Sequence, residues 1–316
     1  MLQEIISKIK ALISQSTQDC KFDSLALSGG LDSSILASCI DDKNVRTFTL
    51  ISKDFSSTDL VYAQLVAKTY DLKLDVIAVD AEELLSALEQ TIKILKVFNP
   101  IEIRNNVVMY LTMKTAKDFG CESIMTGDGA DELFAGYNFF KRLTGKELDK
   151  DLERIWRVMH FPSRSIAKSI GMSLHTPFLD EKVSEYAKKI PSDLKIHEEN
   201  GKKYGKWILR KAFETSLPNS VVWREKAAMQ DGSGTSGLTS FFDNLISDTT
   251  FLEKSKHYEK EKVVLSSKES MYYYEIYRKY FDMPFNLGKS DKSCPNCSYS
   301  LTQDSHFCRM CGSYPI

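Results

Sequence analysis

The stretch Ser24-Leu-Ala-Leu-Ser-Gly-Gly-Leu-Asp-Ser-Ser34 decides the fold of this chain. It is an apolar run, a glycine turn and the beginning of a second apolar run that extends to Ile40. This order predicts a buried strand, a tight turn and the start of a helix. Two glycines let the backbone approach a ligand closely, and the serine hydroxyls and the helix N-terminus suit an anion such as phosphate. We interpret residues 28–34 as an anion-binding loop.

One acidic residue qualifies this interpretation. Asp32 is unfavourable beside phosphate unless Mg²⁺ bridges the two, which is the usual reason for a carboxylate in such a loop. No Lys follows the glycines, so the loop is not of the GxxxxGK[ST] type. The alternative is an ordinary strand–helix turn with capping serines.

Composition limits the function classes. The chain has 316 residues, with 43 acidic against 42 basic side chains and a formal net charge of −1. This balance argues against nucleic-acid binding through overall charge; a local patch stays open but unsupported. No apolar run is long enough for a membrane span, and the N-terminus is not a signal peptide, so we expect a cytoplasmic protein.

Strands alternate with helices in the first half of the chain. We expect a helix over residues 2–15 and further strands over 45–51, 74–79 and 123–125. This alternation predicts a parallel sheet covered on both faces, with ligands at the carboxyl ends of its strands. Residues 126–132, like 28–34, follow such an end, so we expect the two loops to face one crevice.

The second half reads differently. Residues 143–280 are expected to be mostly helical, with a mobile Gly/Ser-rich loop over 230–237 and a linker over 283–293. We therefore expect two domains, 1–285 and 286–316.

The loop after the fourth strand reads Thr126-Gly-Asp-Gly-Ala-Asp-Glu-Leu-Phe-Ala-Gly-Tyr137. It carries three carboxylates, Asp128, Asp131 and Glu132, whose mutual repulsion requires a cation or solvent. By itself this cluster also fits a solvated turn that caps the next helix.

Four motifs in order resemble asparagine synthetases of the PP-loop ATP pyrophosphatase superfamily. These are the two loops, the stretch 171–180 with Pro-Phe-Leu-Asp, and the stretch 206–232 with Trp-Arg-Glu-Lys. The resemblance covers residues 2–235 and implies a doubly wound α/β fold of the adenine nucleotide alpha hydrolase type, with a helical C-terminal half.

The resemblance also implies a reaction. A carboxylate such as aspartate is adenylated by ATP with release of pyrophosphate, and an amine then displaces AMP to form an amide. Asp32 and Asp131 would hold Mg²⁺, Lys226 would stabilise the adenylation transition state, and Asp128 would be catalytic. By itself, Lys226 reads as an exposed helix charge. The implied ATP contacts are Leu27, Ser28, Gly29, Gly30, Leu31, Asp32, Ser33, Ser34, Leu50, Thr126 and Gly127.

The chain departs from the family at three points. Asp128 stands where the family has Glu, and His175, which also fits a packed core histidine, stands where it usually has Arg. Position 2 is Leu, whereas glutamine-dependent members carry a nucleophilic Cys at the start of a glutaminase domain. We expect the amine to come from free ammonia, a separate glutaminase subunit or another nucleophile.

A third motif lies at the end of the chain. Cys294 and Cys297, then Cys308 and Cys311, form two CxxC pairs with spacing typical of a zinc ribbon. A redox dithiol or an iron site is the alternative, and His306 is a less favoured ligand. Zn²⁺ binding would fold so short a segment.

Two other functions stay open. Zinc ribbons accompany PP-loop domains in tRNA thiolases, where Cys39 and Cys121 would handle sulfur. The chain could also be a synthetase subunit whose ribbon docks a glutaminase.

Overall fold

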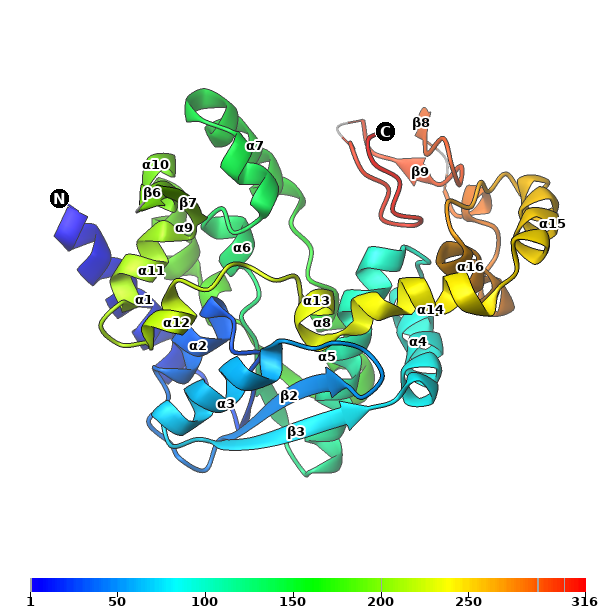
Figure 1. The fold of residues 1–316 in the computed structure, drawn as a ribbon. Helices are drawn as coiled ribbons and strands as arrows, with labels where there is room; N and C mark the ends of the chain where they lie inside the picture. The colour runs from blue at the N-terminus through cyan, green and yellow to red at the C-terminus, as the bar shows by residue number, and fades with distance from the viewer. Residues whose placement is uncertain (1, 200, 289, 304) are drawn as a thin grey trace. The chain divides into compact units, whose positions relative to one another are not determined.

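A parallel sheet of five strands, in the order β3-β2-β1-β4-β5, organises the first half of the chain. Its strands β2 and β3 lie side by side in Figure 1. The computed structural model describes residues 2–199, 201–288, 290–303 and 305–316. Ser24 of β1 lies opposite Arg46 of β2 and Ile124 of β4. The strands are β1 (Ser24–Ala26), β2 (Arg46–Ser52), β3 (Lys73–Val79), β4 (Ser123–Met125) and β5 (Ser173–His175).

The strand order changes direction at β1, which has β2 on one side and β4 on the other. Because parallel crossovers are right-handed, the connections on the two sides of β1 lie on opposite faces of the sheet. Helices α2 (Leu31–Ala37) and α3 (Asp59–Thr69) connect β1, β2 and β3, and α8 (Pro162–Ile170) connects β4 to β5. Helices α4 (Ala81–Leu95) and α5 (Pro100–Asp118) follow β3 in the chain. The doubly wound α/β fold expected from the sequence is confirmed, with its switch point between β1 and β4.

The N-terminal helix α1 (Leu2–Asp19) packs into the same core as the sheet. Its Ile9 and Ile13 side chains are fully buried beside residues of α9 (Glu181–Lys189) and α11 (Trp207–Phe213). The further helical segments of the first 228 residues are α6 (Ala130–Leu133), η1 (Asn138–Arg142), α7 (Gly145–Val158), η2 (Pro177–Leu179), α10 (Ser192–Lys195) and α12 (Asn219–Val222).

An antiparallel hairpin interrupts the region that the sequence predicted to be mostly helical. Strands β6 (Ile196–Glu199) and β7 (Lys202–Gly205) pair with Glu199 opposite Lys202. The hairpin matters because the chain turns directly from β7 into α11 at Lys206.

The predicted mobile loop over 230–237 is wrong. This segment folds into α13 (Met229–Ser233) and η3 (Thr235–Gly237). Thr235 is fully buried, and its hydroxyl donates to the carbonyl oxygen of Arg104 at 3.0 Å. A Cβ on Gly234 would lie 3.0 Å from the carbonyl oxygen of Ser56. The small residues therefore serve close packing, a role that composition does not separate from mobility.

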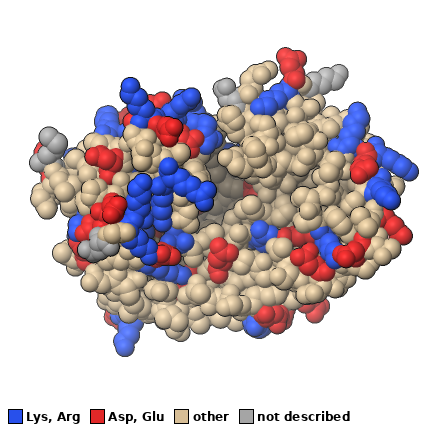
Figure 2. Space-filling model, turned by 45° about the horizontal axis from the view of Figure 1, so that its top comes forward, with Lys and Arg blue, Asp and Glu red and all other residues tan. Residues whose placement is uncertain are grey.

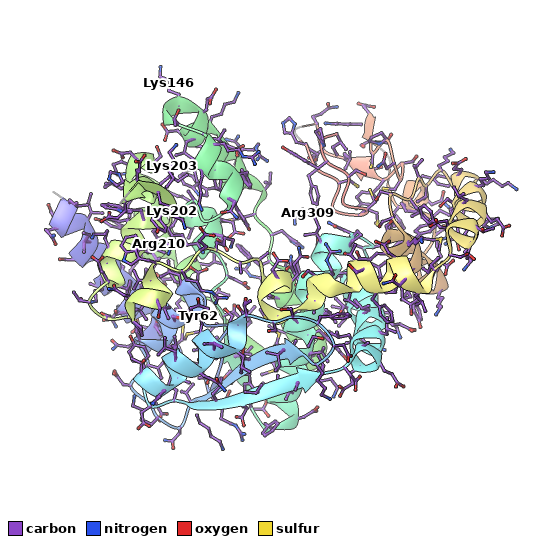
Figure 3. All side chains as sticks on the ribbon, viewed as in Figure 1. Tyr62, Lys146, Lys202, Lys203, Arg210 and Arg309 are labelled. Atoms are coloured by element: carbon purple, nitrogen blue, oxygen red, sulfur yellow. The ribbon has the colours of Figure 1, made fainter. Side chains whose placement is uncertain are left out.

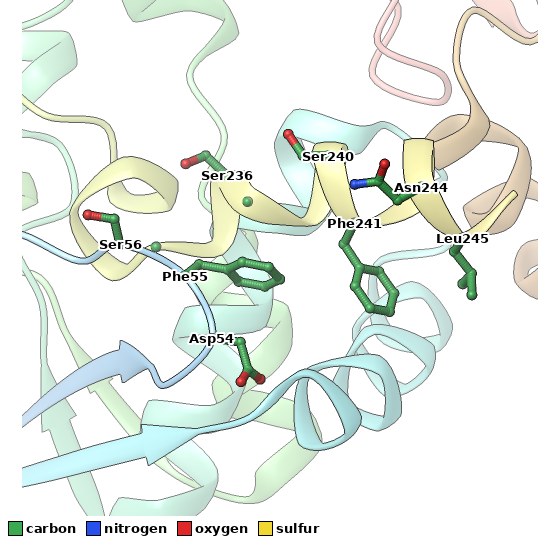
Figure 4. Close-up of a pocket in the computed structure, with 10 residues that line it drawn as sticks. Asp54, Phe55, Ser56, Ser236, Ser240, Phe241, Asn244 and Leu245 are labelled. Atoms are coloured by element: carbon green, nitrogen blue, oxygen red, sulfur yellow. The ribbon is translucent and has the colours of Figure 1, made fainter.

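A pocket of about 700 Å³ lies beside this segment (Figure 4). It is lined by the segment 54–56 and by residues of η3 and α14 (Leu238–Leu245). The rings of Phe55 and Phe241 meet edge to face there, with centroids 6.5 Å apart. The carboxylate of Asp54 accepts the Ala81 N–H at 2.7 Å, so it caps α4.

The chain divides into two compact units by its internal contacts. Unit 1 comprises residues 1–51, 58–77 and 112–228, and unit 2 comprises 52–57, 78–111 and 229–316. Unit 2 also contains α15 (Asp248–Glu259), α16 (Lys268–Tyr280), η4 (Pro284–Asn286), β8 (Lys292–Ser293) and β9 (Ser300–Leu301). The predicted linker 283–293 thus contains η4 and β8, and its Lys289 lies outside the described residues. The domain boundary at 285/286 stays a prediction.

No helix in the described part of the chain is both long and apolar enough to cross a membrane.

The carboxylate of Asp23 holds β4 beside β1, and its removal should destabilise the sheet. It accepts the backbone N–H groups of Glu122 and Ser123 at 2.8 and 3.0 Å and the Ser123 hydroxyl at 3.0 Å. We expect Asp23→Ala to lower the free energy of unfolding by about 1–3 kcal/mol, because these donors lose their acceptor. Urea denaturation measures this, with the exposed Asp19→Ala as the matched control. Equal stability of the two variants would contradict the role.

Candidate active site

The loop after β1 forms a tight cradle of backbone and serine hydroxyls. The Ser28 hydroxyl accepts the Gly30 N–H and lies 3.2 Å from the Ser33 hydroxyl. Gly29 has φ of +69°, and a Cβ there would lie 2.4 Å from the backbone nitrogen of Ala63 in α3. Only glycine fits this position without displacing α3.

The loop after β4 meets this cradle at the switch point of the sheet. A Cβ on Gly127 would lie 2.8 Å from the Cβ of Asp32, so the two loops are in contact. The Thr126 N–H donates to the carbonyl oxygen of His175, the last residue of β5. This contact brings the two predicted loops together, and the crevice that they were expected to face stays a prediction.

Two carboxylates and two ammonium groups form one buried cluster where the loops meet. The Lys206 Nζ atom lies 2.5 Å from Asp32 Oδ2 and 2.7 Å from Asp131 Oδ1. The Lys226 Nζ atom lies 2.6 Å from Asp131 Oδ2. The cluster brings together three predicted site residues and adds Lys206, to which sequence reasoning gave no role.

Glycines and a left-handed turn make room for Lys206. Its backbone φ is 55°, and its N–H donates to the carbonyl oxygen of Phe134 at 3.0 Å. A Cβ on Gly136 would lie 1.9 Å from Asp131 Oδ1 and 2.1 Å from Lys206 Cε. A Cβ on Gly205 would lie 2.4 Å from the carbonyl oxygen of Ala135. The hairpin thus passes close to the second loop only because both positions lack a side chain.

Buried arginines hold the segment that carries Lys226. The Arg210 guanidinium donates to the carbonyl oxygens of Val222 and Arg224. Arg224 in turn pairs with the buried carboxylate of Asp59 in α3 at 2.8 Å. These contacts fix a segment that has no regular structure of its own after α12.

The electrostatics of the cluster differ between its two carboxylates. Burial raises the pKa of Asp131, but the ammonium groups of Lys206 and Lys226 outweigh it and hold that pKa below its ordinary value. Burial disfavours the Lys206 ammonium, but the carboxylates of Asp131 and Asp32 raise its pKa. The pKa of Asp32 is raised, because burial outweighs the attraction of Lys206 and because Asp131 repels it. The cluster therefore stabilises the ionised form of Asp131, whereas the ionised form of Asp32 lacks sufficient compensating positive charge.

The three carboxylates of the second loop have separate partners. Asp131 belongs to the cluster, whereas Asp128 accepts the hydroxyl of Ser163 and Glu132 accepts the Tyr137 hydroxyl at 2.5 Å. Burial raises the pKa of both Asp128 and Glu132. The solvated acidic turn considered from the sequence is therefore wrong, because each carboxylate has its own donor.

The remaining predicted ATP contacts surround the cradle or lie in the adjoining strands. Leu27 and Leu50 are buried, and the Leu27 N–H donates to the carbonyl oxygen of Phe48 within the sheet. Leu31 is the first residue of α2, and the buried Ser34 hydroxyl has no hydrogen-bond partner among the described residues.

The two scattered thiols that a thiolase would need are not placed for chemistry at this site. Cys121 precedes β4, at the opposite end of that strand from the second loop. Cys39 follows α2, with its sulfur 3.4 Å from the Ser14 hydroxyl. Burial raises the pKa of both thiols, which disfavours the reactive thiolate. The structure does not favour the tRNA-thiolase alternative.

Basic side chains gather near the hairpin, where some of them are neutralised. Lys146, Lys202 and Lys203 project from α7 and β7 (Figure 3). Lys202 pairs with Glu225, and Figure 2 shows a group of blue side chains with red ones at its margin. Nucleic acid as a partner remains unsupported.

Comparison with known proteins agrees with the geometry. The asparagine synthase family matches residues 24–169 and 156–301. A probable glutamine-hydrolysing asparagine synthetase of Dictyostelium discoideum is 31% identical over 305 residues, which cover 86% of this chain and 53% of that protein. Asparagine synthetase B of Escherichia coli K12 is 30% identical over 281 residues, covering 82% and 50%.

The chain belongs to the asparagine synthase family. The family resemblance drawn from the four motifs is thereby confirmed. The chain spans about half the length of the curated relatives it matches. Among solved structures, an NMN synthetase from Francisella tularensis aligns with 88% of this chain and 94% of its own, at 12% identity and a TM-score of 0.38.

The sequence carries a signal for the cluster residue that was missed. Lys206 opens the Lys-Trp-Ile-Leu-Arg stretch, directly after Gly205. A lysine directly before an apolar helical run is expected to be buried with that run, and a buried lysine needs an acidic partner.

Removal of Lys206 should leave two buried carboxylates without their shared cation. We expect Lys206→Met to destabilise the protein by about 3 kcal/mol without metal, since breaking a buried ion pair leaves uncompensated charge. Thermal melts should show a larger stabilisation by Mg²⁺ in this variant than in the parent. Adding Asp32→Asn should recover part of the loss, because it removes one of the repelling charges. A double variant that melts at a lower temperature than Lys206→Met, with the two losses adding up, would contradict the shared-cation arrangement.

Asp128 should make stability fall as the pH rises above 4. Its pKa in the folded state is raised by burial, so the folded state keeps a proton that the unfolded state releases, and stability declines until the folded pKa is passed. We expect Asp128→Asn to reduce this decline between pH 4 and pH 7. Ser163→Ala should steepen it, because the lost hydroxyl stabilises the carboxylate. Denaturation at several pH values measures both slopes, and parallel slopes in all three proteins would contradict the assignment.

Proposed function

We propose that this chain is an ATP-dependent ligase that forms AMP and joins a carboxylate to ammonia as an amide. The observation that carries the proposal is the cluster of Asp32, Asp131, Lys206 and Lys226 at the switch point of the sheet. Family membership supports the same reaction. Aspartate or a similar acid is the proposed carboxylate.

The proposed chemistry has two steps. An oxygen of the substrate carboxylate attacks the α-phosphorus of ATP, pyrophosphate leaves, and an acyl-adenylate forms. Ammonia then attacks the carbonyl carbon, AMP leaves, and the nitrogen loses a proton. Catalysis of the first step depends on positioning and on neutralising phosphate charge.

The residues present fit a divalent cation. Oδ1 of Asp32 is buried and has no hydrogen-bond partner in the described part of the chain. Both Asp32 and Asp131 contact the same ammonium group, so one cation can reach both carboxylates. Carboxylate oxygens suit Mg²⁺, which when bound would neutralise phosphate charge. We propose these two residues as its protein ligands.

The lysines have distinct proposed roles. Lys206 is the more buried and bridges the two carboxylates, so it balances their charge before the metal and nucleotide bind. Lys226 pairs with Asp131, lies 5.3 Å from the ring centroid of Tyr137 and is partly exposed. Its proposed role is to turn toward the phosphate oxygens when the nucleotide binds. The hydroxyls and N–H groups of residues 28–34 would hold the pyrophosphate portion.

The acceptor half of the reaction would lie toward Asp128 and His175. His175 ends β5, and its carbonyl oxygen holds the Thr126 N–H of the second loop. Asp128 is the proposed residue for ammonia handling, and a neutral carboxyl can donate a hydrogen bond to an incoming group. We propose ammonia as the nitrogen donor, supplied free or by a glutaminase partner.

Product analysis tests this function. The full chain is incubated with ATP, Mg²⁺ and a panel of carboxylic acids including aspartate, with either ammonium or glutamine. Mass spectrometry should detect AMP, pyrophosphate and one new amide with ammonium. Failure of every acid to release pyrophosphate would overturn the proposal.

Variants of the cluster should separate binding from chemistry. We expect Lys226→Ala to lower the rate of pyrophosphate release by about 10²–10³, because a cation aimed at developing charge is lost. Asp32→Ala should abolish release at low Mg²⁺. Lys188→Ala, an exposed lysine of α9, is the matched control. Equal rates in Lys226→Ala and Lys188→Ala would contradict the role of Lys226.

A further inference from the structure

The four cysteines of the C-terminal segment converge on one point in unit 2. Their sulfur atoms all lie within 4.8 Å of one another. Cys294 and Cys311 Sγ are 3.6 Å apart, and Cys297 and Cys308 Sγ are 3.7 Å apart. A disulfide needs about 2.05 Å. A tetrahedron of sulfurs at about 2.3 Å from a central zinc has edges of about 3.8 Å, which matches these separations.

We propose that the four thiolates bind one Zn²⁺ and that this closed site clamps two loops of unit 2 together. All four tetrahedral positions would be filled by protein sulfur, leaving none for water or substrate, so the site is structural. The proposal is independent of the ligase reaction, because every residue that carries it belongs to unit 2.

The two CxxC turns share one backbone geometry. The Ser298 N–H donates to the Cys294 carbonyl oxygen at 2.9 Å, and the Gly312 N–H donates to the Cys308 carbonyl oxygen at 2.8 Å. Ser298 and Gly312 both have positive φ, 55° and 86°. Each turn therefore curls its two sulfurs toward the same side, and the repeated shape is a pair of metal-binding knuckles.

The first knuckle is tied to the connection between α15 and α16. The Val264 N–H donates to the carbonyl oxygen of Asn296 at 2.6 Å. The Ser298 hydroxyl donates to the carbonyl oxygen of Lys262 at 3.3 Å. Lys262 lies in the turn that follows α15 and has a positive φ of 59°. The hydrogen bond from Ser298 therefore stabilises this turn.

The second knuckle is tied to the connection between α4 and α5. The Phe98 N–H donates to the carbonyl oxygen of Met310 at 2.9 Å. A Cβ on Gly312 would lie 2.6 Å from Oδ1 of Asn99, so the knuckle rests on the residue before Pro100. The buried ring of Phe98 also packs against Tyr274 of α16, with centroids 4.8 Å apart.

The metal would supply the stability that this segment lacks by itself. Strands β8 and β9 have only two residues each, too few to hold a core. The free energy of zinc binding then contributes to the folding of this segment. Because the two knuckles are hydrogen-bonded to the loops at 96–99 and 262–264, zinc binding also stabilises those loops. The zinc ribbon thus holds two loops of unit 2 together and forms part of that compact unit.

Metal analysis of the full chain tests the metal. Mass spectrometry of the purified protein should give one zinc per chain, and a colorimetric chelator should detect its release after a mercurial reagent blocks the thiols. The visible absorption of an iron–thiolate site, or absence of metal after purification with added zinc, would overturn the zinc assignment.

Hydrogen exchange tests the clamp. Stripping the metal with a chelator should raise exchange rates at least tenfold at the N–H groups of Phe98 and Val264, and added Zn²⁺, but not Mg²⁺, should restore protection. Cys297→Ser should have the same effect as stripping, whereas the matched control Cys20→Ser should have none. Peptides from the ATP loop at 24–34 should be unchanged. Zinc loss that leaves protection at 96–99 and 262–264 intact would overturn the clamp while leaving the ligase proposal standing.

Discussion

Charge balance at the meeting point of two loops is the constraint on which unit 1 depends. Asp32 and Asp131 are brought close together in a largely buried place, where two carboxylates cannot both ionise without a cation. Lys206 supplies one cation from a hairpin, and Lys226 supplies another from a segment after α12. Four residues that are far apart in the chain thus balance one another's charge, and loss of any one of them leaves its partners with uncompensated charge.

The fold supports this cluster by close approach of backbone. The change of strand direction at β1 leaves β1 and β4 adjacent, with both following loops at the same edge. Gly127 and Gly136 have no side chains, so Asp32, Asp131 and Lys206 can approach the backbone at these two positions closely. Arg210 fixes the last part of the cluster by hydrogen bonds to backbone carbonyls. The glycines of the motifs are therefore required for the geometry of the cluster, because a side chain at these positions would displace its charged residues.

Sequence reasoning predicted three of the four residues that meet in the cluster and missed Lys206, which joins them. The two loops and their aspartates were visible as glycine turns after apolar runs and as an acidic cluster, whereas Lys226 was indicated only by the resemblance to asparagine synthetases. Lys206 was missed, because a region read as helical contains the hairpin that delivers it. The segment 230–237 was read as mobile, because glycine and serine are equally suited to loops and to tight packing.

The sequence alone determined the alternation of strands and helices in the first half of the chain, the family, and the positions of the two glycine loops and the two CxxC pairs, because these depend on local patterns and spacing. Only the tertiary structure decided which charges meet, that Asp128 and Glu132 have their own donors, and that the two CxxC knuckles rest on separate loops of unit 2. Those relations depend on distances between residues far apart in the chain. Burial makes these contacts important for stability, because in a low-dielectric interior a charge or a hydrogen-bond donor is stable only beside its partner.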